Sequence, residues 1–204
     1  MPIKFLASHN CILFGPSRSG KTEFMLEVIR QKLVEPMPKK IYYMFGVEQG
    51  FMETWNEKEE TPITFIKGLD FDKMDTSEPT LLVVDDLCLS ENKDMANCFL
   101  RGSHHLSISI FYITQNLFPN CPLFRVMSSN CHYFCLWSSQ RNFRQINTLA
   151  RQMFCGKDVN RILNAYKRVG KQNRGFIVLS LAPGLPQELT VLCDFWEWMP
   201  SLYL

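Results

Sequence analysis

The feature that most constrains this chain is a glycine-rich turn that joins an apolar run to an amphipathic stretch. The apolar run covers residues 11–14, and the amphipathic stretch covers residues 21–33 with apolar side chains at helical spacing. The turn has the pattern Gly-x-x-x-x-Gly-Lys-Thr and consists of Gly15, Pro16, Ser17, Arg18, Ser19, Gly20, Lys21 and Thr22. A buried strand, a glycine turn and a helix in this order predict an α/β fold with the turn at a sheet edge.

Every part of this turn favours phosphate binding. Backbone N–H groups in such a turn converge on an anion, and its glycines permit the backbone conformation that this requires. The helix that begins near Lys21 directs the positive end of its dipole at the same anion. We therefore expect the turn to bind ATP, with Lys21 on the β- and γ-phosphates and the Thr22 hydroxyl on Mg²⁺. The alternative is an ordinary glycine-rich turn.

Acidic and amide side chains follow two further apolar runs. Asp85 and Asp86 come directly after residues 81–84, and Gln115 follows residues 108–114. Because ligands of parallel α/β sheets bind outside the carboxyl ends of the strands, Asp85 is placed to hold Mg²⁺, directly or through water. Asp86 is the candidate base that orients the attacking water, and Gln115 is a candidate sensor of the γ-phosphate. Alternatively, Asp86 caps a turn and Gln115 only forms one.

Apolar runs and helical patterns alternate along the chain. We expect strands at residues 11–14, 41–45, 63–66, 81–84, 108–114, 132–137 and 176–181. We expect helices at residues 21–33, 93–100 and 123–128, and two more that end at Gly156 and Gly170, with Asp158 as the cap of the second. This alternation predicts a mostly parallel sheet covered by helices on both faces.

The length of 204 residues fits one ordinary domain and is too short for two. We expect residues 1–204 to form a single domain, with its core at about 8–182 and a tail at 183–204. The charged and aromatic segment 47–62 is interpreted as a surface excursion.

The composition excludes several classes of protein. Hydrophobic residues make up 46% and charged residues 21% of the chain, which is typical of a globular domain. The chain contains no run of about 18 apolar residues, so no transmembrane helix is expected, and its N-terminus lacks a secretory signal's long apolar stretch. The eight cysteines are scattered without zinc-ligand spacing, which indicates reduced thiols in an intracellular protein.

Charged residues are distributed unevenly, although the net charge is only +2. Residues 48–78 contain nine acids and three bases, whereas residues 141–174 contain nine bases and one acid. Such an asymmetry is typical of a protein that binds a polyanion such as nucleic acid, but a solvated basic face produces the same pattern.

Taken together, these motifs resemble the FtsK–HerA superfamily of P-loop motors. More narrowly, the chain resembles its viral branch, the genome-packaging ATPases of poxvirus-like, polinton-like and adintovirus-like elements. The resemblance covers roughly residues 8–182 and is most specific in the strand ending in Thr-Gln-Asn-Leu-Phe and in the Arg151-Gln152 element. The residues that carry it are 15–22, 81–87, 101–105, 112–118, 130–133, 139–141 and 149–153.

This resemblance implies an additional-strand P-loop NTPase fold of the RecA/FtsK-like kind. It also implies a Mg²⁺-dependent ATPase that translocates double-stranded DNA, packaging a viral genome into a preformed capsid. Lys21 and Thr22 would bind phosphate and metal, Asp85 would bind metal, and Gln115 matches the sensor glutamine. Asp86 takes the place where many relatives carry a catalytic glutamate.

The resemblance further implies an arginine that a neighbouring subunit supplies to stabilise charge on the transferred phosphoryl group. Arg101 is preferred because it ends the helix that follows Asp86. Each such arginine could instead be a surface charge or a DNA contact. The other candidates are Arg125, Arg141, Arg144 and Arg151.

The implied assembly is a homo-oligomeric ring, a pentamer or hexamer, with duplex DNA threaded through it. A capsid or portal-vertex protein is the expected docking partner, and no membrane partner is expected. The expected location is a nuclear or cytoplasmic assembly site in an infected host cell, or the virion. Lys167, Arg168, Lys171 and Arg174 could follow the DNA phosphates, or could be cations at a helix end.

Three other functions fit parts of the pattern. A small-molecule or nucleotide kinase needs an acceptor pocket, whereas paired acids with a strand-end glutamine favour attack by water. A GTPase needs an Asn-Lys-x-Asp signature, and residues 92–95 read Asn-Lys-Asp-Met instead. A scaffold that binds ATP only to assemble is disfavoured by the set Lys21, Asp85, Asp86 and Gln115.

Overall fold

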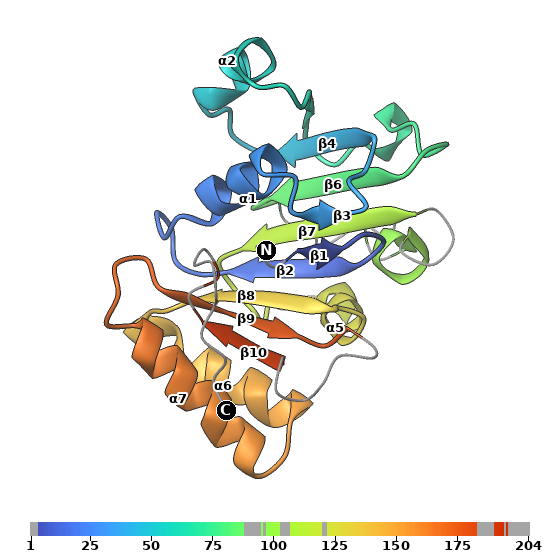
Figure 1. Ribbon diagram of the computed structural model, residues 1–204. Coiled ribbons are helices and arrows are strands. Elements are labelled where there is room, and N and C mark those ends of the chain that lie inside the picture. The colour runs from blue at the N-terminus through green and yellow to red at the C-terminus, as the bar shows by residue number, and fades with distance from the viewer. Residues whose placement is uncertain are drawn as a thin grey trace.

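The centre of the molecule is one eight-stranded sheet with the order β10-β9-β8-β2-β7-β6-β4-β5 (Figure 1). The computed structural model describes residues 4–87, 95, 97–102, 107–119, 122–182, 190–193 and 195. The strands of this sheet are β2 Asn10–Phe14, β4 Lys40–Phe45, β5 Thr64–Lys67, β6 Thr80–Asp85, β7 Ile108–Thr114, β8 Tyr133–Trp137, β9 Phe176–Ser180 and β10 Val191–Cys193. A separate pair joins β1 Phe5–Leu6 to β3 Val34–Glu35.

Most of the large sheet is parallel, which confirms the prediction. The strands from β8 to β5 all pair in parallel, and only β9 and β10 at one edge pair antiparallel. β7 lies between β2, which leads into the glycine turn, and β6, which ends in Asp85. This inserted strand is the additional-strand arrangement that the resemblance implied.

Helices cover both faces of the sheet. Successive strand residues point to opposite faces, so each strand contributes side chains to the helix layer on either side. Cys11 and Leu13 pack with α1 (Lys21–Arg30), whereas Ile12 and Phe14 pack with α6 (Phe143–Met153) and α7 (Lys157–Val169). Both faces are therefore apolar, as a parallel sheet between helices requires. The helices are α1 Lys21–Arg30, α2 Phe51–Lys58, α5 Pro122–Ser129, α6 Phe143–Met153 and α7 Lys157–Val169, with the short helices η1 Phe71–Lys73, η2 Cys98–Gly102 and η3 Gln140–Asn142.

The helix predicted at residues 21–33 ends earlier, at Arg30, because the chain turns there toward β3. Lys32 has a φ of 54°, which is incompatible with a right-handed helix. Leu33 is nevertheless buried and donates its N–H to the Val28 carbonyl at 2.9 Å. Its side chain therefore continues the apolar spacing beyond the end of the helix.

Other segments also differ from the sequence predictions. α2 occupies the segment interpreted as an excursion, and Trp55 is its one buried residue, so the apolar pattern there is weak. β10 adds a strand within residues 183–204. Gly156, not Asp158, is the N-cap of α7, and Asp158 lies in its first turn. Of the helix predicted at 93–100, the described residues 95 and 97 are helical and residues 98–100 belong to η2, whereas residues 93, 94 and 96 lie outside the described part of the chain.

Candidate nucleotide site

The glycine turn, the paired acids and Gln115 meet at one edge of the sheet. The turn follows β2, Asp86 follows β6 and Gln115 follows β7, and these three strands lie side by side in parallel. The Gly15 N–H donates to the Thr114 carbonyl at 3.3 Å, and the Asp86 N–H donates to the Ile113 carbonyl at 3.1 Å. β7 thus fixes both neighbouring strand ends, and the three groups share one space.

The glycine turn has a backbone that its residue types explain. Gly20, directly before α1, has a φ of 98°, and Arg18 has a φ of 61°. Gly15 is required for a different reason, since a Cβ atom there would lie 2.6 Å from the Cβ atom of Trp137 on β8. The turn therefore packs against the adjacent strand and leads into the N-terminus of α1, a geometry suited to an anion.

Lys21 is buried inside the glycine turn. Its Nζ donates to the carbonyl oxygens of Gly15 at 2.9 Å and Pro16 at 2.7 Å. Burial lowers the pKa of Lys21 from its ordinary value, and the negative charges of Asp86 and Asp85 oppose that shift. The negative charge of a phosphate in the turn would stabilise the charged form of this buried lysine.

Asp85 is anchored by three donors to one carboxylate oxygen. The Thr22 hydroxyl at 3.3 Å, the Tyr43 hydroxyl at 2.6 Å and the Gln49 amide at 3.0 Å all donate to Oδ2. Hydrogen bonds of this kind fix the orientation of a metal-binding carboxylate. The sequence did not single out Tyr43 or Gln49. Tyr43 lies within an apolar strand, where its hydroxyl is the only signal, and Gln49 lies in a polar segment without a recognisable pattern.

The donor set fits Mg²⁺. This ion takes oxygen ligands and keeps several waters, so one or two protein oxygens beside a phosphate are sufficient. The Thr22 hydroxyl and the Asp85 carboxylate are such oxygens, and they lie within hydrogen-bonding distance of each other. Among the described residues, no cluster of three or more His, Cys, Asp and Glu side chains could hold a metal ion. When bound here, Mg²⁺ would neutralise charge on the β- and γ-phosphates.

We expect Tyr43→Phe to weaken Mg²⁺-dependent nucleotide binding by about tenfold or more, because losing an outer-shell hydrogen bond typically has this effect. Burial and the nearby charge of Asp85 raise the pKa of Tyr43, so its hydroxyl remains a donor. Titration of Mg²⁺ against a fluorescent ATP analogue measures the effect. Tyr42→Phe is the matched control, since the Tyr42 hydroxyl accepts from the Asp75 N–H instead. An unchanged Mg²⁺ dependence in Tyr43→Phe would contradict the anchoring role.

Asp86 and Gln115 form a hydrogen-bonded pair with exposed side chains. Gln115 Nε2 donates to Asp86 Oδ2 at 2.5 Å. Asp86 has a φ of 49°, a left-handed conformation that aspartate adopts more readily than most residues. With Nε2 engaged, a water between the two side chains could donate one proton to Asp86 and the other to the Gln115 amide oxygen. The pair is therefore suited to orienting one water.

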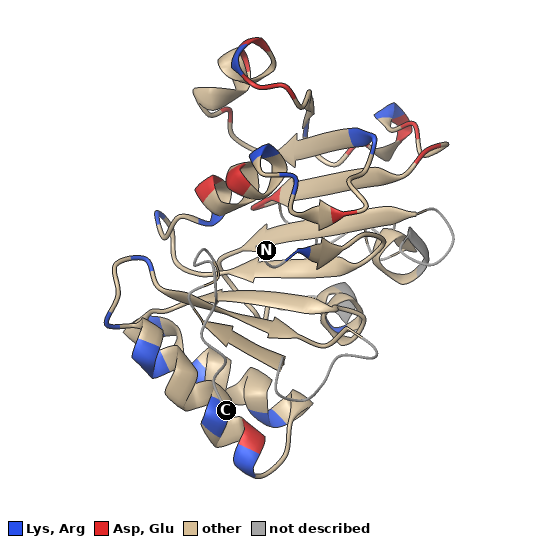
Figure 2. Ribbon diagram, in the orientation of Figure 1, with Lys and Arg blue, Asp and Glu red and all other residues tan. Residues whose placement is uncertain are grey.

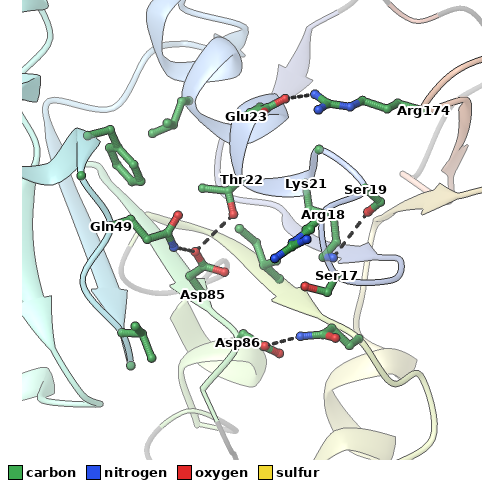
Figure 3. A pocket seen from close by; sticks show the side chains of 18 residues that line it. Ser17, Arg18, Ser19, Lys21, Thr22, Glu23, Gln49, Asp85, Asp86 and Arg174 are labelled. Atoms are coloured by element: carbon green, nitrogen blue, oxygen red, sulfur yellow. Dashed lines mark hydrogen bonds and ion pairs between the residues drawn. The ribbon is translucent and has the colours of Figure 1, made fainter.

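A cavity of about 770 Å³ connects these groups (Figure 3). Residues 17–23 form one side, and Asp85, Asp86 and Gln115 form another. A third side comes from the segment after β4 and includes Gln49. The volume is in the range of small-molecule and cofactor sites.

The arginines near this cavity are not those that the sequence favoured. The backbone of Arg101 lies in η2, but its side chain lies outside the described part of the structure. The arginines in the described lining are Arg18 and Arg174. The candidates that the described lining does not include are Arg125, Arg141, Arg144 and Arg151.

Solved structures with the same arrangement of strands and helices include two viral packaging proteins. The genome packaging NTPase B204 from Sulfolobus turreted icosahedral virus 2, in complex with ATP-gammaS, aligns with a TM-score of 0.55 and 11% identity, covering 85% of this chain and 93% of that chain. The chain has the fold of the P-loop NTPases. The DNA-packaging ATPase B204 from Sulfolobus turreted icosahedral virus aligns with a TM-score of 0.53 and 9% identity over 86% of this chain and 93% of that chain.

A solved structure of a protein that is not described as a packaging protein also aligns with this chain. The flagellar accessory protein FlaH from Methanocaldococcus jannaschii aligns with a TM-score of 0.53 and 9% identity over 98% of this chain and 89% of that chain. No family model matches this sequence, and no curated protein matches it. Within the described residues, none of the helices has the length and apolar character needed to cross a membrane.

Proposed function

We propose that this protein is a Mg²⁺-dependent ATPase. The observation that carries the proposal is the convergence of Lys21, Thr22, Asp85, Asp86 and Gln115 on one cavity at the sheet edge. The glycine turn would hold the phosphates of ATP, with Lys21 on the β- and γ-phosphates, and Thr22 and Asp85 would hold Mg²⁺.

Asp86 and Gln115 would act on the attacking water. Asp86 accepts a proton from this water while Gln115 orients it toward the γ-phosphorus. The new bond joins the water oxygen to phosphorus, and the bond from phosphorus to the β,γ-bridging oxygen breaks, giving ADP and phosphate. A kinase would have to place a larger acceptor at the same point, where the hydrogen-bonded pair favours water instead.

Duplex DNA is the proposed polyanion, and a basic surface on α6 and α7 supports this choice (Figure 2). The two helices contain six bases and one acid, Asp158. Their apolar sides pack on the sheet, as at Ile146 and Ile162, so the charged sides face outward. Contacts of this kind with DNA phosphates are insensitive to sequence and sensitive to salt.

The negative charge of the acidic segment 48–78 is largely neutralised by ion pairs in the fold. Six of its nine acids form ion pairs, and four of the bases come from residues 30–40. Those four pairs are Arg30–Glu59, Lys32–Glu60, Lys40–Asp75 and Lys39–Glu78. The basic surface on α6 and α7 is therefore the stronger electrostatic feature of the described chain.

A ring of subunits around DNA, with five or six members, would complete the site. Val47 lines the cavity although its exposed fraction is 79%, so a neighbouring subunit could cover this apolar side chain. The neighbour would also supply the arginine at the γ-phosphate, and Arg101 remains the preferred candidate for that role.

The two viral NTPases with the same fold package genomes, as their descriptions state, and this supports genome packaging here. The partner would then be a capsid or portal-vertex protein in an infected cell.

Translocation is tested by displacement of a triplex-forming strand from long duplex DNA. We expect displacement with ATP and Mg²⁺, and none with a non-hydrolysable ATP analogue or with Lys21→Ala. The rate should fall steeply with salt if DNA phosphates are the contacts. ATP hydrolysis without displacement would support the ATPase and contradict the translocase. Transfer of the phosphoryl group to a nucleoside monophosphate would favour a kinase.

A further inference from the structure

Residues 170–175, between α7 and β9, form a tightly packed turn. A Cβ atom on Gly175 would lie 1.9 Å from the carbonyl oxygen of Val169, so this position requires glycine. The Ser138 N–H, just after β8, donates to the Gly175 carbonyl at 2.8 Å, and the Gln172 N–H donates to the Val169 carbonyl at 3.0 Å. Backbone contacts therefore fix the position of the residue that precedes Gly175.

That residue, Arg174, reaches the glycine turn of the nucleotide site. Its guanidinium forms an ion pair with Glu23 in the first turn of α1 (Figure 3). A Cβ atom on Gly20 would lie 3.5 Å from Cδ of Arg174. The aliphatic part of Arg174 thus lies against the glycine turn, and its charged end lies beside α1. The sequence grouped Arg174 with Lys167, Arg168 and Lys171, but the fold places it at the cavity.

Arg174 borders two neighbouring cavities. It lines the cavity of about 770 Å³ described above and a second cavity of about 300 Å³. Ser19, Gly20 and Glu23 also line both. The second cavity therefore continues the phosphate site past the first turn of α1.

Arg174 and Asp86 lie on opposite sides of the end of the glycine turn (Figure 3). In Figure 3, Asp86 lies on one side of Lys21 and Thr22, whereas Glu23 and Arg174 lie on the other. Asp86 is assigned to the γ-phosphate end, and the phosphate chain runs through the glycine turn from γ to α. The α-phosphate and the ribose would then leave the turn on the side of Arg174.

We propose that Arg174 binds the α-phosphate and ribose end of ATP, from within the same subunit. This inference rests on the proposed nucleotide site and names a contact at the end opposite the γ-phosphate. A guanidinium group has five donors in a planar fork, so Arg174 can hold Glu23 and a phosphate oxygen together. Its charge also neutralises Glu23, whose carboxylate would otherwise repel the nucleotide.

Measured nucleotide affinities distinguish a contact of Arg174 with the α-phosphate from a contact with the γ-phosphate and from no contact with the nucleotide. Arg174→Ala should weaken binding of ADP and of a non-hydrolysable ATP analogue by the same factor, about tenfold, because both contain the α-phosphate. Adding Glu23→Gln should restore part of the loss, because the uncompensated carboxylate is removed. Arg30→Ala is the matched control and should bind nucleotide normally, because Arg30 is also a partly exposed, ion-paired arginine but lies outside both described linings.

The variants are expected to fold, because Arg174 and Glu23 are 54% and 69% exposed and surface ion pairs contribute little to stability. Equal melting temperatures would verify this. Normal affinity of Arg174→Ala for both nucleotides would overturn the inference. A loss confined to the ATP analogue would also overturn it, because the contact would then be to the γ-phosphate. Absence of nucleotide binding by the unaltered protein would contradict the proposed function itself, and not only the role of Arg174.

Discussion

Lys21→Ala is expected to abolish ATP hydrolysis, with a fall of at least about a hundredfold, because one preorganised charge at a reacting phosphate has effects of this size. The native ammonium is held by the carbonyl oxygens of Gly15 and Pro16 at 2.9 and 2.7 Å, so it is already in place when the nucleotide binds. Nucleotide affinity should fall as well, because charge-assisted hydrogen bonds to phosphate are lost. Steady-state release of phosphate and binding of a fluorescent ATP analogue measure the two effects.

Lys39→Ala is the matched control for this substitution. Lys39 lies on the surface, where it pairs with Glu78, and it should be replaceable without effect on hydrolysis. Near-normal turnover in Lys21→Ala would remove the assignment of the nucleotide site altogether. The alternative of an ordinary glycine-rich turn would then stand.

Asp86→Asn is expected to keep nucleotide and Mg²⁺ binding and to lose hydrolysis by about a hundredfold to ten-thousandfold, the usual contribution of a general base. Asparagine is the appropriate replacement, because the φ of 49° at this position is accessible to it. It keeps the size of the side chain but not the basic oxygen. Single-turnover hydrolysis, with binding measured separately, distinguishes the two effects.

Asp72→Asn, in η1, provides the control for loss of one carboxylate elsewhere. If Asp86→Asn loses binding together with hydrolysis, Asp86 is a metal ligand or a structural residue, and the base lies elsewhere. If hydrolysis persists at the normal rate, the pair of Asp86 and Gln115 does not orient the water.

The mostly parallel sheet and the meeting of Asp85, Asp86 and Gln115 beside the glycine turn could be predicted because their signals are local. The glycine turn is one continuous motif, and Asp85, Asp86 and Gln115 each directly follow a continuous apolar run. In a parallel sheet, such strand ends meet at one edge, so the convergence follows from the chain's pattern. The position of β7 between β2 and β6 was implied by the resemblance and is confirmed by the fold.

The roles proposed for Tyr43 and Arg174 rest on contacts between distant segments, which the sequence did not reveal. Tyr43 donates to Asp85 across 42 positions of the chain, and Arg174 reaches Glu23 across 151. No local pattern distinguishes Tyr43 from a buried aromatic residue or Arg174 from a helix-end cation. α2 was missed because only Trp55 is buried on it, which gives no helical periodicity.

The most direct test of the account is steady-state ATP hydrolysis with and without long duplex DNA, across a series of protein concentrations. We expect DNA to stimulate hydrolysis and the activity to rise cooperatively with protein concentration, because a neighbouring subunit would supply an arginine to the site. Hydrolysis that depends on neither DNA nor protein concentration would contradict the ring motor and direct attention to a phosphoryl acceptor or to an assembly role.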